Sequence, residues 1–72
     1  MTQERLEEIC QQTGKTETKI WDLYVDKRID YRPTKGEEKS IELAITETAD
    51  ELKIEHAESL RLYAFLHDKM LG

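Results

Sequence analysis

The chain has 72 residues, of which 38% are hydrophobic and 38% charged, and its 11 basic against 16 acidic side chains give a net charge of −5. So short a chain makes one domain at most, which excludes an enzyme with a separate cofactor domain. A core of this size supplies only about 3–5 kcal/mol of stability without a partner. The composition is too apolar for a disordered tail and too polar for a membrane span, and the negative charge argues against non-specific nucleic-acid binding. We therefore expect a single helical domain over residues 1–72.

The N-terminus begins Met-Thr-Gln-Glu, without the apolar run of a secretion signal, and Cys10 is the only cysteine. A lone cysteine cannot form a disulfide within the chain, which favours a reducing, cytoplasmic location. No stretch reaches the roughly 20 apolar residues of a bilayer span, so no membrane association is expected.

Residues 3–13 are predicted to form the first helix. Thr2 precedes them in the position of an N-cap, and Gly14 follows where a left-handed C-terminal cap belongs. The apolar residues recur at helical spacing, namely Leu6, Ile9 and Cys10.

A second helix is expected to begin after Thr16, whose hydroxyl can cap it, with Glu17 at the positive end of the helix dipole. Its apolar residues cover more than half a turn, which predicts the most buried element of the fold. These residues are Ile20, Trp21, Leu23, Tyr24 and Val25.

Residues 30–36 are predicted to form the one real loop. Pro33 pushes Arg32 toward an extended conformation, so the second helix should end at or before Arg32. Thr34 and Glu37 have the spacing of a capping box and are expected to start a third helix.

From Glu37 to Leu71 there is neither proline nor glycine, and apolar or amphipathic residues recur every three or four positions. This pattern permits one continuous helix. The alternative, which we favour, is two helices with a bend around Lys53 to Ala57. The stripe comprises Ile41, Ile45, Thr48, Leu52, His56, Leu60, Tyr63, His67 and Met70.

The predicted fold is therefore an all-α bundle of three or four helices, in which one long C-terminal helix is the three-helix alternative. The expected core consists of Leu6, Ile9, Ile20, Trp21, Leu23, Tyr24, Ile41, Ile45, Leu52, Leu60, Tyr63, Phe65 and Leu66.

The inventory of reactive side chains predicts no catalytic residue, no cofactor, no metal site and no small-molecule substrate. Cys10 lies on an apolar helix face, where a thiol acts as a small hydrophobe. The chain has no cysteine pair, no His-x-x-x-His and no glycine-rich phosphate loop. His56 and His67 fall on the stripe, either as boundary residues or as a pH-sensitive dimer seam.

Four glutamates spaced four, four and three apart are expected to line one face of the third helix and its continuation. Such a face is either solvated or a docking site for a protein with a basic surface. We select it as the candidate protein-binding site: Glu47, Glu51, Glu55 and Glu58.

Basic residues gather in one segment, around Tyr31 and Pro33. They form either a solvated loop near a helix C-terminus or the one place where phosphate could dock. This basic island comprises Lys27, Arg28, Arg32, Lys35 and Lys39.

Cys10, Gly14 and Ile20 stand at the small-x-x-x-Gly-x-x-x-x-x-aliphatic spacing of the helix-turn-helix unit, so residues 6–25 resemble that DNA-binding motif. The resemblance implies that the second helix reads the major groove. The side chains presented there are Lys15, Thr16, Thr18 and Lys19, on a helix that also carries Glu17, Asp22 and Asp26.

Residues 28–70 are similar in element order to ribbon-helix-helix repressors. By this resemblance Arg28 to Arg32 forms a short strand that pairs across a dimer, and two helices follow. Arg28, Asp30 and Arg32 would then face the groove.

Two functions follow as hypotheses. The first is a small non-enzymatic regulator or adaptor that binds another protein and forms a homodimer, because the core is small and the stripe long. The second is a small DNA-binding regulator of helix-turn-helix or ribbon-helix-helix type. Its contacts would come from Lys15, Thr18, Lys19, Lys27, Arg28, Arg32 and Lys35.

Overall fold

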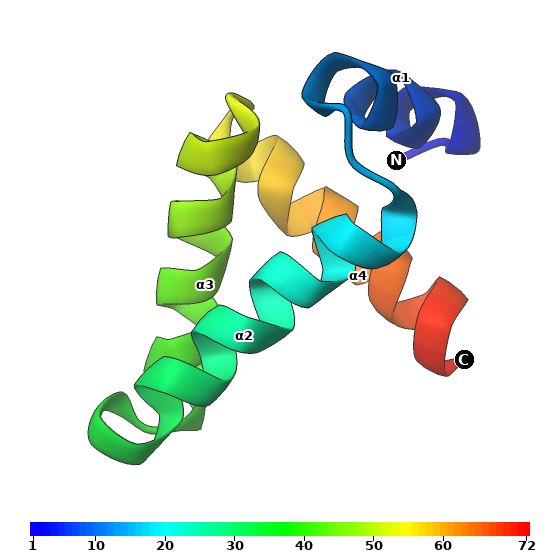
Figure 1. Cartoon of the computed structure of the whole chain (residues 1–72). Coiled ribbons are helices and arrows are strands. Elements are labelled where there is room, and N and C mark those ends of the chain that lie inside the picture. Colours follow the sequence, from blue (N-terminus) through cyan, green and yellow to red (C-terminus); the bar gives the residue numbers. More distant parts are fainter.

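The computed structural model describes all 72 residues as four helices and no strand, which confirms the all-α expectation. They are α1 (Gln3–Thr13), α2 (Glu17–Lys35), α3 (Glu37–Leu52) and α4 (His56–Leu71). In Figure 1, α2 and α3 run in opposite directions from a sharp turn at Gly36, α4 crosses α2, and α1 lies near the start of α2. None of the four helices is both long enough and apolar enough to span a bilayer.

The caps of α1 and the start of α2 are as predicted. The Thr2 and Thr16 hydroxyls accept the backbone N–H groups of Arg5 and Lys19, each at 3.2 Å. Gly14 ends α1 in the left-handed region at φ +69°. These local signals depend on a few adjacent residues, which is why the sequence alone identifies them.

The predicted end of α2 is wrong, because the helix continues through Pro33 to Lys35. Proline removes one helical N–H, and near a helix end this costs a single bond. The last turns are held from outside, since Lys27 and Tyr31 bond to carboxylates of α3. The predicted capping box does not form: the Thr34 hydroxyl donates to the Tyr31 carbonyl, and α3 begins after Gly36 without a side-chain cap.

The continuous C-terminal helix is wrong, and the expected bend is present. Lys53 takes a left-handed conformation at φ 58° and ends α3. The Ile54 N–H donates to the Ala49 carbonyl at 3.0 Å and the Lys53 N–H to the Asp50 carbonyl at 3.3 Å, the two bonds of a Schellman motif. Ile54 packs against the core and secures the turn.

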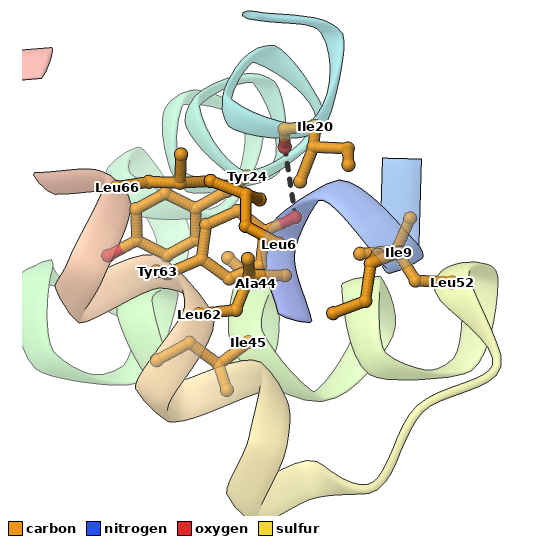
Figure 2. Packing of buried hydrophobic residues seen from close by; sticks show 10 residues of the cluster. All are labelled: Leu6, Ile9, Ile20, Tyr24, Ala44, Ile45, Leu52, Leu62, Tyr63 and Leu66. Atoms are coloured by element: carbon orange, nitrogen blue, oxygen red, sulfur yellow. Dashed lines mark hydrogen bonds between the residues drawn. The ribbon is translucent and has the colours of Figure 1, made fainter. Parts of the chain in front are cut away.

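The core collects residues from all four helices around the crossing of α2 and α4 (Figure 2). Helix α3, with six buried residues, is more buried than α2, with two, contrary to expectation. The core consists of Leu6, Ile9, Ile20, Tyr24, Ala44, Ile45, Leu52, Leu62, Tyr63 and Leu66.

The expected core is correct for most residues and wrong on α4. Leu60 is 51% exposed, whereas Leu62, which was not selected, is fully buried. The remaining selections are partly buried and pack around the core, namely Trp21, Leu23, Ile41 and Phe65.

Small polar residues set the contact of α3 with α4. Thr48 and Ser59 are fully buried, and the Ser59 hydroxyl donates to the Ile45 carbonyl at 2.9 Å. Their hydroxyl oxygens lie 3.3 Å apart. The absence of bulky side chains here lets the two helices approach closely, and each hydroxyl has a partner, as burial requires.

Candidate functional site

The four glutamates selected from the sequence do not form a continuous surface, because α3 ends at Leu52. Glu47 and Glu51 point toward α2 instead. The Lys27 ammonium donates to Glu51 at 2.9 Å and lies 3.8 Å from Glu47, which also accepts the Tyr31 hydroxyl. The Glu51 carboxylate raises the pKa of Lys27, and the Glu47 carboxylate raises the pKa of Tyr31.

The other two glutamates lie beyond the bend. Glu58 forms a bidentate pair with Arg5 of α1, with both N···O distances 2.7 Å, and the guanidinium lowers the pKa of Glu58. Glu55 is exposed at the start of α4. Three of the four carboxylates therefore serve contacts between the protein's own helices.

Another polar contact between helices, which was not foreseen from the sequence, joins the two ends of the chain. The Lys69 ammonium contacts Glu17 at 2.6 Å and donates to Gln3 at 2.7 Å, and the Gln3 amide donates to Glu17 at 2.9 Å. Lys69 and Gln3 together lower the pKa of Glu17. The carboxylate placed to complement the helix dipole thus also links α4 with the starts of α1 and α2.

The residues of the basic island do not form one cluster in the folded protein. Lys27 is engaged with α3, and Lys39 lies 3.8 Å from Glu42. Arg32 and Lys35 are exposed near the end of α2 and form no ion pair. The island therefore does not converge on a single phosphate-sized point.

Residues 6–25 do form two helices joined by a short turn, with Cys10 half-buried and Ile20 fully buried. Thr18 and Lys19 are exposed on the first turn of α2, Lys15 is half-exposed in the turn, and Thr16 caps the helix. The strand predicted by the ribbon-helix-helix resemblance is wrong, because Arg28 to Arg32 is helical.

The histidines do not lie in the core. His56 is exposed, and the His67 side chain is 60% exposed, with its ring centre 6.3 Å from the ring of Trp21. Burial raises the pKa of the half-buried Cys10 thiol, which is the opposite of activation. No group of three His, Cys, Asp or Glu side chains is placed to hold a metal ion.

The surface of α2 that points away from α3 carries an accessible apolar side chain. Ile29 is 63% exposed in the middle of α2 and is accompanied by half-buried Val25. With Arg28 and Arg32, these residues line a shallow hollow of about 170 Å³. The two larger hollows of the molecule are lined almost entirely by polar side chains.

Arg28 is held in place from within the protein. Its guanidinium lies 5.4 Å from the centre of the Tyr24 ring, whose own stacking partner is Tyr63 at 4.6 Å. The Nε atom is buried and has no hydrogen-bond partner, and no carboxylate of the chain pairs with the guanidinium. This cation thus lies on an aromatic face beside an exposed isoleucine.

Opposite charges border the apolar centre. Asp22 and Asp26 are exposed and unpaired on one side, while Arg28 and Arg32 border the other. We call this set the outer face of α2: Asp22, Val25, Asp26, Arg28, Ile29 and Arg32.

Sequence reasoning missed the outer face because it counted Val25 among the apolar residues of a buried helix and placed Arg32 in a loop over residues 30–36. The signal was present in the spacing of Asp22, Val25, Ile29 and Arg32, which are three, four and three apart. That spacing is typical of a helix seam that contacts another helix.

No family model matches this chain, and neither a curated protein nor a solved structure matches it.

Proposed function

We propose that this protein is a small non-enzymatic regulator or adaptor that acts by binding a polypeptide, and that the outer face of α2 is its contact surface. The observation that carries the proposal is the exposed Ile29 between Arg28 and Arg32 in a hollow. Exposed apolar residues scattered singly are ordinary, but here Val25 and two arginines adjoin one. Arginine is enriched among the few residues that contribute most of the binding energy at protein interfaces.

The charge pattern favours a polypeptide over DNA as the partner. Asp22 and Asp26 lie on the same exposed surface as the arginines and would meet phosphates with the wrong sign. In the helix-turn-helix alternative the reading residues are Lys15, Thr18 and Lys19, and Asp22 lies one turn beyond Thr18. Mixed charges around an apolar centre instead suit another helix, since they fix orientation while apolar contact supplies affinity.

The test is site-specific photo-crosslinking in the native host, with a benzophenone amino acid at Ile29. The matched control carries the same amino acid at Thr46, which is exposed on α3. We expect a crosslinked polypeptide from position 29 and none from position 46, and we expect Arg32→Asp to abolish it. The absence of any polypeptide adduct at position 29 would overturn the proposal.

A duplex-binding assay tests the DNA alternative independently. We expect no retention of DNA at physiological salt. Retention that falls steeply with salt, and that Lys15→Gln with Lys19→Gln removes, would favour the helix-turn-helix function instead.

A further inference from the structure

The outer face of α2 is complementary to itself, and this symmetry identifies a partner. Along α2, Asp22 and Arg32 lie equally far on either side of Lys27. The same holds for the apolar residues Val25 and Ile29, and for Asp26 and Arg28. Near the centre of the face, acidic Asp22 thus mirrors basic Arg32, and each apolar position mirrors another apolar one, while Asp26 and Arg28 lie at the two edges.

We infer that the occupant of this face is a second copy of the chain, with the two α2 helices packed antiparallel about a two-fold axis at the level of Lys27. This inference rests on the proposed function, because it uses the same surface. Lys27 itself points away from the axis, into its ion pair with Glu51 of α3. The side of α2 opposite Lys27 is therefore open at the level where the axis passes.

In this arrangement every contact is made twice, as two-fold symmetry requires. Asp22 of one copy meets Arg32 of the second copy. Asp26 and Arg28 lie on opposite edges of the helix contact and do not face each other across the axis. The interface gains two opposite-charge pairs from groups that are unpaired within the single chain.

The apolar centre fits the same register. Val25, Arg28, Ile29 and Arg32, spaced i, i+3, i+4 and i+7, surround the hollow of about 170 Å³. Four residues at this spacing form the hole into which a facing helix inserts a side chain. With the axis at Lys27, the side chain at this height on the facing helix is Val25 of the second copy.

Other partners match the charges of the outer face of α2 less completely. A parallel pair of α2 helices would place Asp22 against Asp22 and Arg32 against Arg32, which is repulsive. A uniformly acidic or uniformly basic partner would complement one edge and oppose the other. A helix with charges of both signs in reversed order matches both ends of the face, at Asp22 and at Arg32, and the protein's own α2 has that order.

The experiment is sedimentation equilibrium on the purified full chain, over loading concentrations from about 1 µM to about 1 mM. We expect a reversible dimer of twice the 8.5 kDa chain mass. Asp22→Arg and Arg32→Asp each create two like-charge pairs across the axis, and each is expected to weaken the dimer about tenfold or more.

Mixing these two variants provides the sharpest result. In a heterodimer, antiparallel pairing sets α2 of the Asp22→Arg variant against α2 of the Arg32→Asp variant. Positions 22 and 32 then carry opposite charges across the axis at both ends of the interface, so both charge pairs are restored. We expect the mixture to recover near wild-type affinity although each variant alone is largely monomeric. The matched controls are Asp50→Arg and Arg61→Asp, exposed positions on α3 and α4 that should leave the dimer unchanged.

Helical content by circular dichroism separates loss of pairing from loss of folding, since the side chains of Asp22 and Arg32 form no ion pair within the chain. A wild-type protein that stays monomeric throughout, or a dimer that Asp22→Arg and Arg32→Asp do not weaken, overturns the inference. A mixture that fails to recover overturns the antiparallel register. A monomeric protein that still yields a foreign polypeptide adduct at position 29 overturns self-pairing alone and leaves the proposed function intact.

Discussion

The Tyr63 hydroxyl of α4 donates a hydrogen bond of 2.9 Å to the main-chain carbonyl of Ile20 in α2 (Figure 2). This bond lies where α2 and α4 cross, and the Tyr63 ring stacks there on Tyr24. Burial raises the pKa of Tyr63 well above its ordinary value, because the surroundings cannot solvate a phenolate. The same tyrosine ring supports Arg28 through Tyr24, so this crossing also positions the outer face of α2.

Removing the hydroxyl should test the strength of this crossing. Tyr63→Phe keeps the stacked ring and deletes the bond, so we expect the free energy of unfolding to fall by about 1 kcal/mol in urea melts. The matched control is Tyr24→Phe, since the Tyr24 hydroxyl makes no hydrogen bond to the protein and its loss should change little. Equal effects of the two substitutions would contradict this account.

The rotational setting of α4 can be tested with two leucines. Leu62→Ala should lower the free energy of unfolding by about 2–5 kcal/mol, because it opens a cavity in the core. Leu60→Ala, at an exposed position, should change it by less than about 0.5 kcal/mol. Chemical denaturation of both variants provides the comparison, and a larger loss at Leu60 would refute the burial pattern on α4.

This pair of leucines also shows where sequence reasoning fails in the fold. The regular steps from Leu52 through His56 to Leu60 read as one helical stripe. The Schellman turn at Lys53 interrupts the helix, so the periodicity before it does not determine which face of α4 is buried. Local signals such as the Thr2 and Thr16 caps are predictable because they depend on adjacent residues only.

The sequence did not predict which surface is free, because this depends on contacts between helices that are distant in the chain. Whether Glu47 and Glu51 face solvent depends on whether α2 continues far enough to bring Lys27 and Tyr31 beside them. Pro33 predicts a helix end from local preference, and the contacts with α3 outweigh it. The acidic face predicted from spacing therefore became an interhelical contact, and the exposed side of α2 became the available surface.

The turn between α3 and α4 should gain stability from glycine. Lys53 adopts a left-handed conformation that L side chains rarely take. Lys53→Gly relieves this cost and should raise the free energy of unfolding by about 0.5–1 kcal/mol in urea melts. The reverse change, Gly14→Ala, should lower the free energy of unfolding by about 1 kcal/mol, because φ is +69° there. No atom lies within 4 Å of an added Cβ, so the loss would come from the backbone conformation and not from a steric clash.

Both substitutions act at C-terminal caps, so they form a paired test of one conformational cause. Lys53 and Gly14 occupy corresponding positions after α3 and α1. Destabilisation by Lys53→Gly would mean that the lysine side chain contributes more than its backbone strain costs, and would contradict the explanation.

Stability should fall in acid because two interhelical carboxylates are stabilised in the folded state. Arg5 lowers the pKa of Glu58, and Lys69 with Gln3 lowers the pKa of Glu17. A carboxylate whose folded pKa lies below its unfolded value contributes stability that is present above the unfolded value. That stability is lost as the pH falls through the folded value. We therefore expect the melting temperature to decrease as the pH falls below about 5.

Glu58→Gln assigns part of this pH dependence to one pair. The variant should melt below the wild type at neutral pH, because the bidentate contact with Arg5 is lost, and the difference should shrink as the wild-type carboxylate protonates in acid. Glu55→Gln is the matched control, since Glu55 is exposed, pairs with no cation and lies only three residues away. Its melting temperature should run parallel to that of the wild type across the series. A Glu58→Gln curve that is also parallel would show that the Arg5 contact does not contribute to acid sensitivity.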